Sequence, residues 1–105
     1  MGVHKLIYAP RAQEDVREHV AYLRRKGETV RLRRFDEALA TLEVGLLAFP
    51  RSGRALTQGP RRSVRRIGLR YLPLFVWYVY EPERDEITIV RLFHVKQSTP
   101  PPPAP

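Results

Sequence analysis

The chain lacks cysteine altogether, and it has no long apolar run near its start. The absence of cysteine excludes a disulfide scaffold and any thiolate metal or redox site. The opening MGVHKLIYAPRAQEDV holds only a few apolar residues before charges resume, which fits neither a signal peptide nor a membrane-spanning helix. We therefore expect a soluble, cytoplasmic protein without a membrane partner.

Motifs that commonly carry chemistry are also missing. There is no glycine-rich phosphate loop, no Gly-x-Ser-x-Gly nucleophile elbow and no His/Asp/Glu cluster with the spacing of metal ligands. The histidines, His4, His19 and His94, fall in different predicted elements. We therefore expect neither a metal ion nor a cofactor.

Acidic residues are absent from one arginine-rich part of the chain. The formal net charge is +8, and residues 51–105 carry ten basic and four acidic side chains, whereas residues 1–50 carry nine and seven. Between Arg51 and Arg70 there are seven arginines and no Asp or Glu. A solvated face explains a preference for arginine, but it explains the lack of acids less well. Because guanidinium groups bind phosphate and carboxylate, we expect an anionic partner.

Apolar periodicity predicts a short strand followed by two helices. HKLIYAP alternates weakly, which favours a strand over residues 3–8. Pro10 suits a helix start, with Glu14 and Asp15 expected in the first turn. The first helix should end near Lys26 at Gly27, and Thr29 should cap the second. The apolar stripes are Ala12, Val16, Val20 and Leu23 in the first helix, and Leu32, Phe35, Leu39, Leu42 and Leu46 in the second.

The next part of the chain has the pattern of strands. After the turn-rich FPRSGRALTQGP, strands are predicted over residues 63–69, 74–80 and 86–94. The middle strand is apolar on both faces, as in the centre of a sheet. The predicted fold is α+β with the order β-α-α-β-β-β, a helical hairpin packed on a small, mainly antiparallel, twisted sheet. The first strand pairs either at an edge or beside a later strand through a long crossover.

Length and composition divide the chain into a folded part and a tail. A chain of 105 residues forms one domain, which we place at residues 1–97. Five of the last eight residues are proline and none is apolar and bulky. Residues 98–105 are therefore predicted to be a disordered, polyproline-like tail.

Cationic and aromatic side chains occur together in the predicted sheet. If the strands form a meander, these groups meet at one end or face. RNA cleavage by internal attack of the 2′-hydroxyl requires a base, an acid and cations, which His94 with arginine and tyrosine neighbours would supply there. In the alternative, Trp77 and the tyrosines are core residues of a central strand. The residues are Arg61, Arg62, Arg65, Arg66, Arg70, Tyr71, Trp77, Tyr78 and Tyr80, with Arg91, His94 and Lys96 on or beyond the last strand.

Four segments in order resemble the RelE/ParE superfamily of toxins from type II toxin–antitoxin modules, over residues 3–97. They are IYAPRAQEDVREHVAYL, FPRSGRAL, VRRIGLRYLPLFVWYVY and ITIVRLFHVKQ. The resemblance implies a toxin that forms a hetero-oligomer with a cognate antitoxin, whose acidic, amphipathic C-terminal segment wraps the toxin and neutralises it. Such a segment needs arginines for charge pairing and apolar grooves beside them, and folding on binding supplies the wrap.

The superfamily divides by mechanism, and this sequence resembles the ParE-like branch more closely. ParE-like members inhibit DNA gyrase, whereas RelE-like members cut mRNA on the ribosome. The ParE-like features are the loop Pro50-Arg51-Ser52-Gly53-Arg54, the long second helix, Arg65-Arg66-Ile67 and Arg91-Leu92-Phe93-His94. One departure is that Lys96-Gln97 stands where a basic pair commonly follows the histidine.

The two mechanisms imply different roles for the same residues. In the ParE-like mechanism no catalytic residue is expected. In the nuclease alternative, Arg65, Arg70 and Arg91 would hold phosphate and His94 would be the catalytic histidine. Under either mechanism we expect the antitoxin or the target to contact Arg54, Arg61, Arg62, Arg65, Arg66, Arg91 and Lys96.

Overall fold

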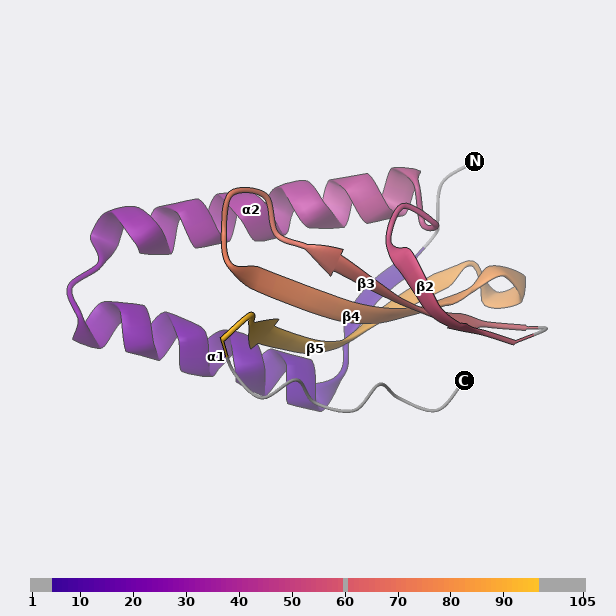
Figure 1. The fold of residues 1–105 in the computed structure, drawn as a ribbon, viewed down its shortest axis with the longest axis horizontal. Coiled ribbons are helices and arrows are strands. Elements are labelled where there is room, and N and C mark those ends of the chain that lie inside the picture. The colour runs from indigo at the N-terminus through magenta and orange to yellow at the C-terminus, as the bar shows by residue number, and fades with distance from the viewer. Residues whose placement is uncertain (1–4, 60, 97–105) are drawn as a thin grey trace.

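The chain folds as one short strand, two helices and then four further strands (Figure 1). The computed structural model describes residues 5–59 and 61–96, so the predicted tail at residues 98–105 lies outside the described residues. The elements are β1 (Lys5–Tyr8), α1 (Pro10–Arg25), α2 (Thr29–Ala48), β2 (Arg54–Gln58), β3 (Ser63–Gly68), β4 (Leu74–Glu81), a short 3-10 helix (Pro82–Arg84) and β5 (Glu86–His94).

The strands form one five-stranded sheet in the order β1-β5-β4-β3-β2. β1 runs parallel to β5, and the other neighbouring strands are antiparallel. The predicted α+β class, with a helical hairpin and a mainly antiparallel sheet, is confirmed. β1 lies at an edge of the sheet and pairs with the last strand, β5. The two arrangements predicted for it, an edge position and pairing with a later strand, therefore both occur.

β2 is an additional strand that the sequence pattern did not predict. It lies inside the stretch interpreted as a turn region, and it is only five residues long. Its pairing with β3 shifts register between Ala55 and Thr57, as at a β-bulge. The formation of β2 therefore depends more on backbone hydrogen bonds to β3 than on its own residue pattern.

The helical hairpin covers one face of the sheet, and the core lies between them. The predicted stripe of α2 is confirmed, since Phe35 and Leu46 are 1% and 0% exposed. Trp77 points to the other face, is 3% exposed and packs edge-on against Phe93, which confirms its assignment as a core residue. The residues of β4 that share the helices' buried cluster are Leu74, Val76, Tyr78 and Tyr80.

Local signals place the helix ends correctly but not every cap. Pro10 is the first residue of α1, and Gly27 follows its end with φ 66°. Glu14 and Asp15 lie in the second turn, not the first as predicted. Thr29 is the first residue of α2 and Glu28 occupies the cap position. In the described part of the chain, neither helix is long and apolar enough to cross a membrane.

Candidate functional site

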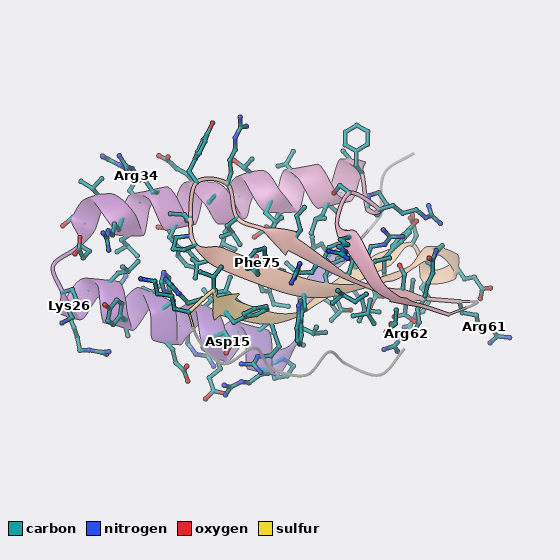
Figure 2. The ribbon with its side chains drawn as sticks, viewed as in Figure 1. Asp15, Lys26, Arg34, Arg61, Arg62 and Phe75 are labelled. Atoms are coloured by element: carbon teal, nitrogen blue, oxygen red, sulfur yellow. The ribbon has the colours of Figure 1, made fainter. Side chains whose placement is uncertain are left out.

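The predicted site residues are spread along a molecule that measures 45 × 28 × 22 Å. Arg54, Arg66 and Arg91 lie in one row across the sheet, because Arg54 is opposite Arg66 and both Arg66 and Arg91 are opposite Trp77. Arg61 and Arg62 lie at the tip of the β2–β3 hairpin, far from Lys26 and Arg34 at the joined end of the helical hairpin (Figure 2). Arg54, Arg65 and Arg66 lie on β2 and β3. On β5 and just beyond it stand Arg91, His94 and Lys96.

Arg65 is a buried residue that holds a loop. It is 7% exposed and lies opposite Tyr78 in the β3–β4 pairing. Its Nη1 donates to the carbonyl oxygens of Arg51, at 3.1 Å, and Gly53, at 2.8 Å. Its Nε donates to Ser63 Oγ at 3.0 Å. Since these donors are satisfied within the protein, the contacts of Arg65 fix the loop at residues 51–53.

Tyr78 closes the same loop from β4. Its hydroxyl donates to the Pro50 carbonyl oxygen at 2.8 Å and accepts the Gly53 N–H at 2.9 Å. Burial raises the pKa of the Tyr78 hydroxyl, and the Gly53 N–H opposes that rise. The loop Pro50-Arg51-Ser52-Gly53-Arg54, which resembles the corresponding loop of ParE-like members, thus connects the end of α2 to the sheet. Its contacts with Arg65 and Tyr78 centre on Gly53.

Five other arginines of the Arg51–Arg70 stretch have no carboxylate within 4.0 Å among residues 5–59 and 61–96; they are Arg51, Arg54, Arg61, Arg66 and Arg70. Arg54 and Arg66 are directly opposite each other in the β2–β3 pairing, where like charges destabilise the sheet. The Cζ atom of Arg66 lies 5.0 Å from the centre of the Phe75 ring, and the Cζ atom of Arg70 lies 5.1 Å from the centre of the Tyr71 ring. Such stacking orients a guanidinium and leaves its N–H edge available to an anion.

Arg91 and His94, but not Lys96, line a pocket of about 650 Å³ between the helical hairpin and the sheet. Its walls come from α1, the start of α2, the β3–β4 turn and the end of β5, so the helical hairpin brings the first half of the chain against the last strand. Its charged and titratable residues are Arg11, Arg31, Arg34, Arg91, Asp15, Glu18, His19 and His94, and its apolar floor includes Leu23, Phe35, Leu74 and Leu92.

Asp15 is buried in this pocket and joins α1 to β5. Its carboxylate accepts the Arg91 Nε at 2.8 Å and the backbone N–H of Leu92 at 3.0 Å, and Arg11 Nε lies 3.4 Å away. β1 pairs only with residues 86–89 of β5, so Leu92 presents its N–H at a strand edge that β1 does not reach. Asp15 supplies the missing acceptor and holds Arg91 in an ion pair.

His19 and His94 face the same pocket from α1 and β5. The His19 ring lies 6.5 Å from that of Tyr22 and 4.7 Å from that of Phe35. Burial lowers the pKa of His19 below its ordinary value of 6.5, and repulsion from His94 lowers it further. His19 is therefore predominantly neutral at neutral pH.

This lowered pKa predicts a pH dependence of stability. As the pH falls below 6.5, the unfolded chain takes up a proton at His19 that the folded chain resists. The stability that His19 contributes is present above 6.5 and is lost as the pH falls from there to the lower folded-state pKa. In urea unfolding at a series of pH values, His19→Gln should show a shallower loss of stability on acidification. Parallel curves for the two proteins would contradict this account.

The candidate nuclease residues do not surround one point. Arg91 and His94 line the pocket, but Arg65 is buried beside the loop at residues 51–53. Arg70 stacks on Tyr71 in the β3–β4 turn, and Arg91 is held by Asp15. Within the described residues, no three or more His, Asp or Glu side chains are grouped as a metal site.

Sequence reasoning missed two residues that matter in this pocket. Asp15 lies within the buried stripe of α1, between Ala12 and Leu23, and an acid in such a stripe signals a hidden cationic partner. Arg34 carries no such signal, because it is one of several arginines on the exposed side of α2. Its place at the pocket follows from the position of the hairpin against the sheet.

This fold and its arginine-rich surface define a small, basic α+β protein. The sequence matches, over residues 6–99, the family described as ParE toxin of type II toxin-antitoxin system, parDE. The chain belongs to this family, and it is therefore the toxin of a toxin–antitoxin module with an antitoxin as its partner.

A solved structure described as "Chromosomal ParDE TA system from P. aeruginosa" has a similar fold. The TM-score is 0.66, with 15% sequence identity over 88% of this chain and 96% of that one. At this identity the likeness establishes the fold alone. No curated protein matches the chain in sequence.

Proposed function

We propose that this toxin inhibits DNA gyrase by binding to it, with no chemistry of its own. The observation that supports binding over catalysis is the separation of the candidate nuclease residues, together with the internal contacts of two of them. Arg65 donates to the carbonyl oxygens of Arg51 and Gly53, and Arg91 donates to Asp15. A guanidinium engaged in this way is less available to stabilise a phosphorane. A gyrase target also implies a cytoplasmic location.

We further propose that the antitoxin presents an acidic, amphipathic C-terminal segment to this toxin and forms a hetero-oligomer with it. Support comes from the charge distribution, because arginines without carboxylate partners stand next to aromatic and apolar side chains. Such surfaces favour a partner that supplies both carboxylates and apolar side chains.

A second candidate function is a ribosome-dependent mRNA endonuclease with His94 as the acid–base residue. The observation that favours it is that Arg91 and His94 line the same pocket. In this alternative the ribosome and mRNA are the target, and Arg91 would need to leave Asp15 to hold phosphate.

Replacing His94 with alanine separates the two functions. If the toxin acts by binding gyrase, expression of His94→Ala in bacteria should arrest growth as strongly as expression of the wild type. A nuclease would lose about 10²–10⁴-fold in RNA cleavage without its general acid–base group. Growth arrest that disappears in His94→Ala, with the protein still folded by circular dichroism, would contradict the gyrase proposal and favour the endonuclease.

A further inference from the structure

The outer face of the C-terminal half of α2 is apolar and exposed. Figure 1 shows α2 along the outside of the molecule, with the strands and α1 on its other side. The inner face of α2 carries the buried stripe that ends at Leu46. On the outer face, Val44 is 69% exposed, and Ala40, Thr41 and Ala48 are exposed as well. A helix that is apolar on both faces is typically covered on both, which indicates a partner for the outer face.

The exposed residues of this outer face have the spacing of a contact between two helices. Glu37, Thr41, Val44 and Ala48 are 4, 3 and 4 residues apart, and all four are exposed. This is the 3.5-residue period of side chains that pack between paired helices. Phe49 follows directly after the helix and is 71% exposed, so it adds a large apolar side chain at this end. The spacing therefore favours another helix as the element that covers the outer face.

Basic residues are absent from this part of α2. The chain has 19 basic residues, yet none lies between Arg34 and Arg51. Residues 38–49 contain one charged side chain, Glu43, and its carboxylate accepts the Tyr8 hydroxyl at 2.7 Å. An acidic segment, such as the one proposed for the antitoxin, would find no cation here and would be repelled by Glu37. Two copies of a chain of net charge +8 repel each other over most of their surfaces, but not over this one.

The charges at the two ends of this face are complementary to each other. Asp36 and Glu37 precede the apolar residues, and Arg51, which is exposed and stacks on Tyr80, follows them. None of these three charged side chains has an oppositely charged group within 4.0 Å among residues 5–59 and 61–96. At a rise of 1.5 Å per residue, Glu37 and Arg51 are about 20 Å apart, which is too far to pair within one chain. Each is seven residues from Val44, on opposite sides of it.

We propose that the outer face of α2 is an interface between two copies of this chain, whose α2 helices pack antiparallel about a twofold axis at Val44. In a twofold contact, each residue of one copy meets the residue that lies equally far beyond the axis in the other copy. Ala40 of each copy then lies opposite Ala48 of the other, and these small side chains permit a short distance between the helix axes. Glu37 of each copy lies opposite Arg51 of the other. This inference does not depend on which target the toxin inhibits.

Sedimentation equilibrium of the purified full chain over a range of concentrations tests this interface. The wild type should form a dimer whose fraction rises with concentration. Val44→Glu should raise the dissociation constant of the dimer by about tenfold or more, because it places two like charges at the axis. The matched control is Val30→Glu, which makes the same substitution at a 52% exposed valine in the first turn of α2, outside the proposed contact. Circular dichroism shows that each variant is folded.

Exchange of the flanking charges tests the antiparallel arrangement. Glu37→Arg and Arg51→Glu should each weaken the dimer, because each substitution places two like charges opposite each other. A chain that carries both substitutions should regain the dimer, since each contact between the copies then joins opposite charges again. The two residues cannot pair within one chain, so this recovery would have to arise between copies.

The interface is supported if Val44→Glu weakens the dimer, Val30→Glu does not, and the double variant recovers it. A wild-type chain that stays monomeric up to its limit of solubility overturns the proposal. Equal dimerisation of Val44→Glu and the wild type overturns it too, as does a double variant no better than the two single ones. If the wild type is monomeric and Val44→Glu no longer co-purifies with the antitoxin, the outer face of α2 belongs to the antitoxin, which also overturns the proposal.

Discussion

Asp15→Ala is expected to lower the free energy of unfolding by about 3 kcal/mol at neutral pH. The substitution removes the acceptor for Arg91 Nε and for the Leu92 N–H, at 2.8 and 3.0 Å. It leaves a partly buried guanidinium without its ion pair and a buried backbone donor at the edge of β5 without a partner. Urea unfolding followed by circular dichroism measures the change. The urea concentration at the unfolding midpoint should fall, while the dependence of the free energy on urea concentration stays constant.

Glu14→Ala is the matched control for Asp15→Ala. Glu14 is the preceding residue of α1, it is exposed, and its pair with Arg11 is 3.4 Å long at the surface. Loss of this surface ion pair should lower the free energy of unfolding by at most about 1 kcal/mol. The free energy of unfolding of Asp15→Asn should lie between those of Asp15→Ala and Glu14→Ala, because an amide oxygen still accepts the Leu92 N–H. Equal effects of Asp15→Ala and Glu14→Ala would show that Asp15 does not join α1 to β5 as described.

Gly53→Ala should also lower the free energy of unfolding by about 3 kcal/mol. A Cβ at residue 53 would lie 2.6 Å from the Tyr78 hydroxyl oxygen, 2.7 Å from its Cε1 and 3.0 Å from the Arg66 carbonyl oxygen. Tyr78 cannot swing away without breaking its hydrogen bonds to Pro50 and Gly53, which are buried. Thermal or urea unfolding of the purified variant measures this loss.

Gly45→Ala is a control for which we expect the free energy of unfolding to rise instead of fall. Gly45 lies within α2, and a Cβ there would meet nothing within 4 Å. Alanine is a better helix former than glycine, so this variant should be more stable than the wild type by up to about 1 kcal/mol. Little or no destabilisation by Gly53→Ala would contradict the close packing of Tyr78 against the loop.

Most of the fold follows from local patterns. The stripe from Leu32 to Leu46 has the period of a helix, and the run of β4 is continuously apolar as in a central strand, so each element is predictable from its own residues. β2 was not, because its backbone is ordered by pairing with β3 across a register shift and its five residues carry no strong alternation. The sequence does not determine the neighbour of β1 for a related reason, since a parallel pairing with β5 depends on the whole intervening chain.

The site was less predictable, because its contacts join residues far apart in sequence. Asp15 and Arg91 are 76 positions apart, and the pairing is visible only once α1 lies against the edge of β5. Arg65 looked like its neighbours in an arginine cluster, yet alternation along β3 turns it toward the loop at residues 51–53, where it is buried. Arg66, the next residue, points the other way and stacks on Phe75. Composition predicted the charge of the surface but could not separate structural arginines from exposed ones.

The measurement that tests the central claim most directly compares two targets at the same protein concentrations. One reaction contains purified DNA gyrase with relaxed plasmid, and the other contains translating ribosomes with a defined mRNA. We expect inhibited supercoiling or trapped, cleaved DNA in the first and intact mRNA in the second. Cut mRNA with unaffected supercoiling would contradict the binding mechanism and make the pocket with Arg91 and His94 a catalytic site.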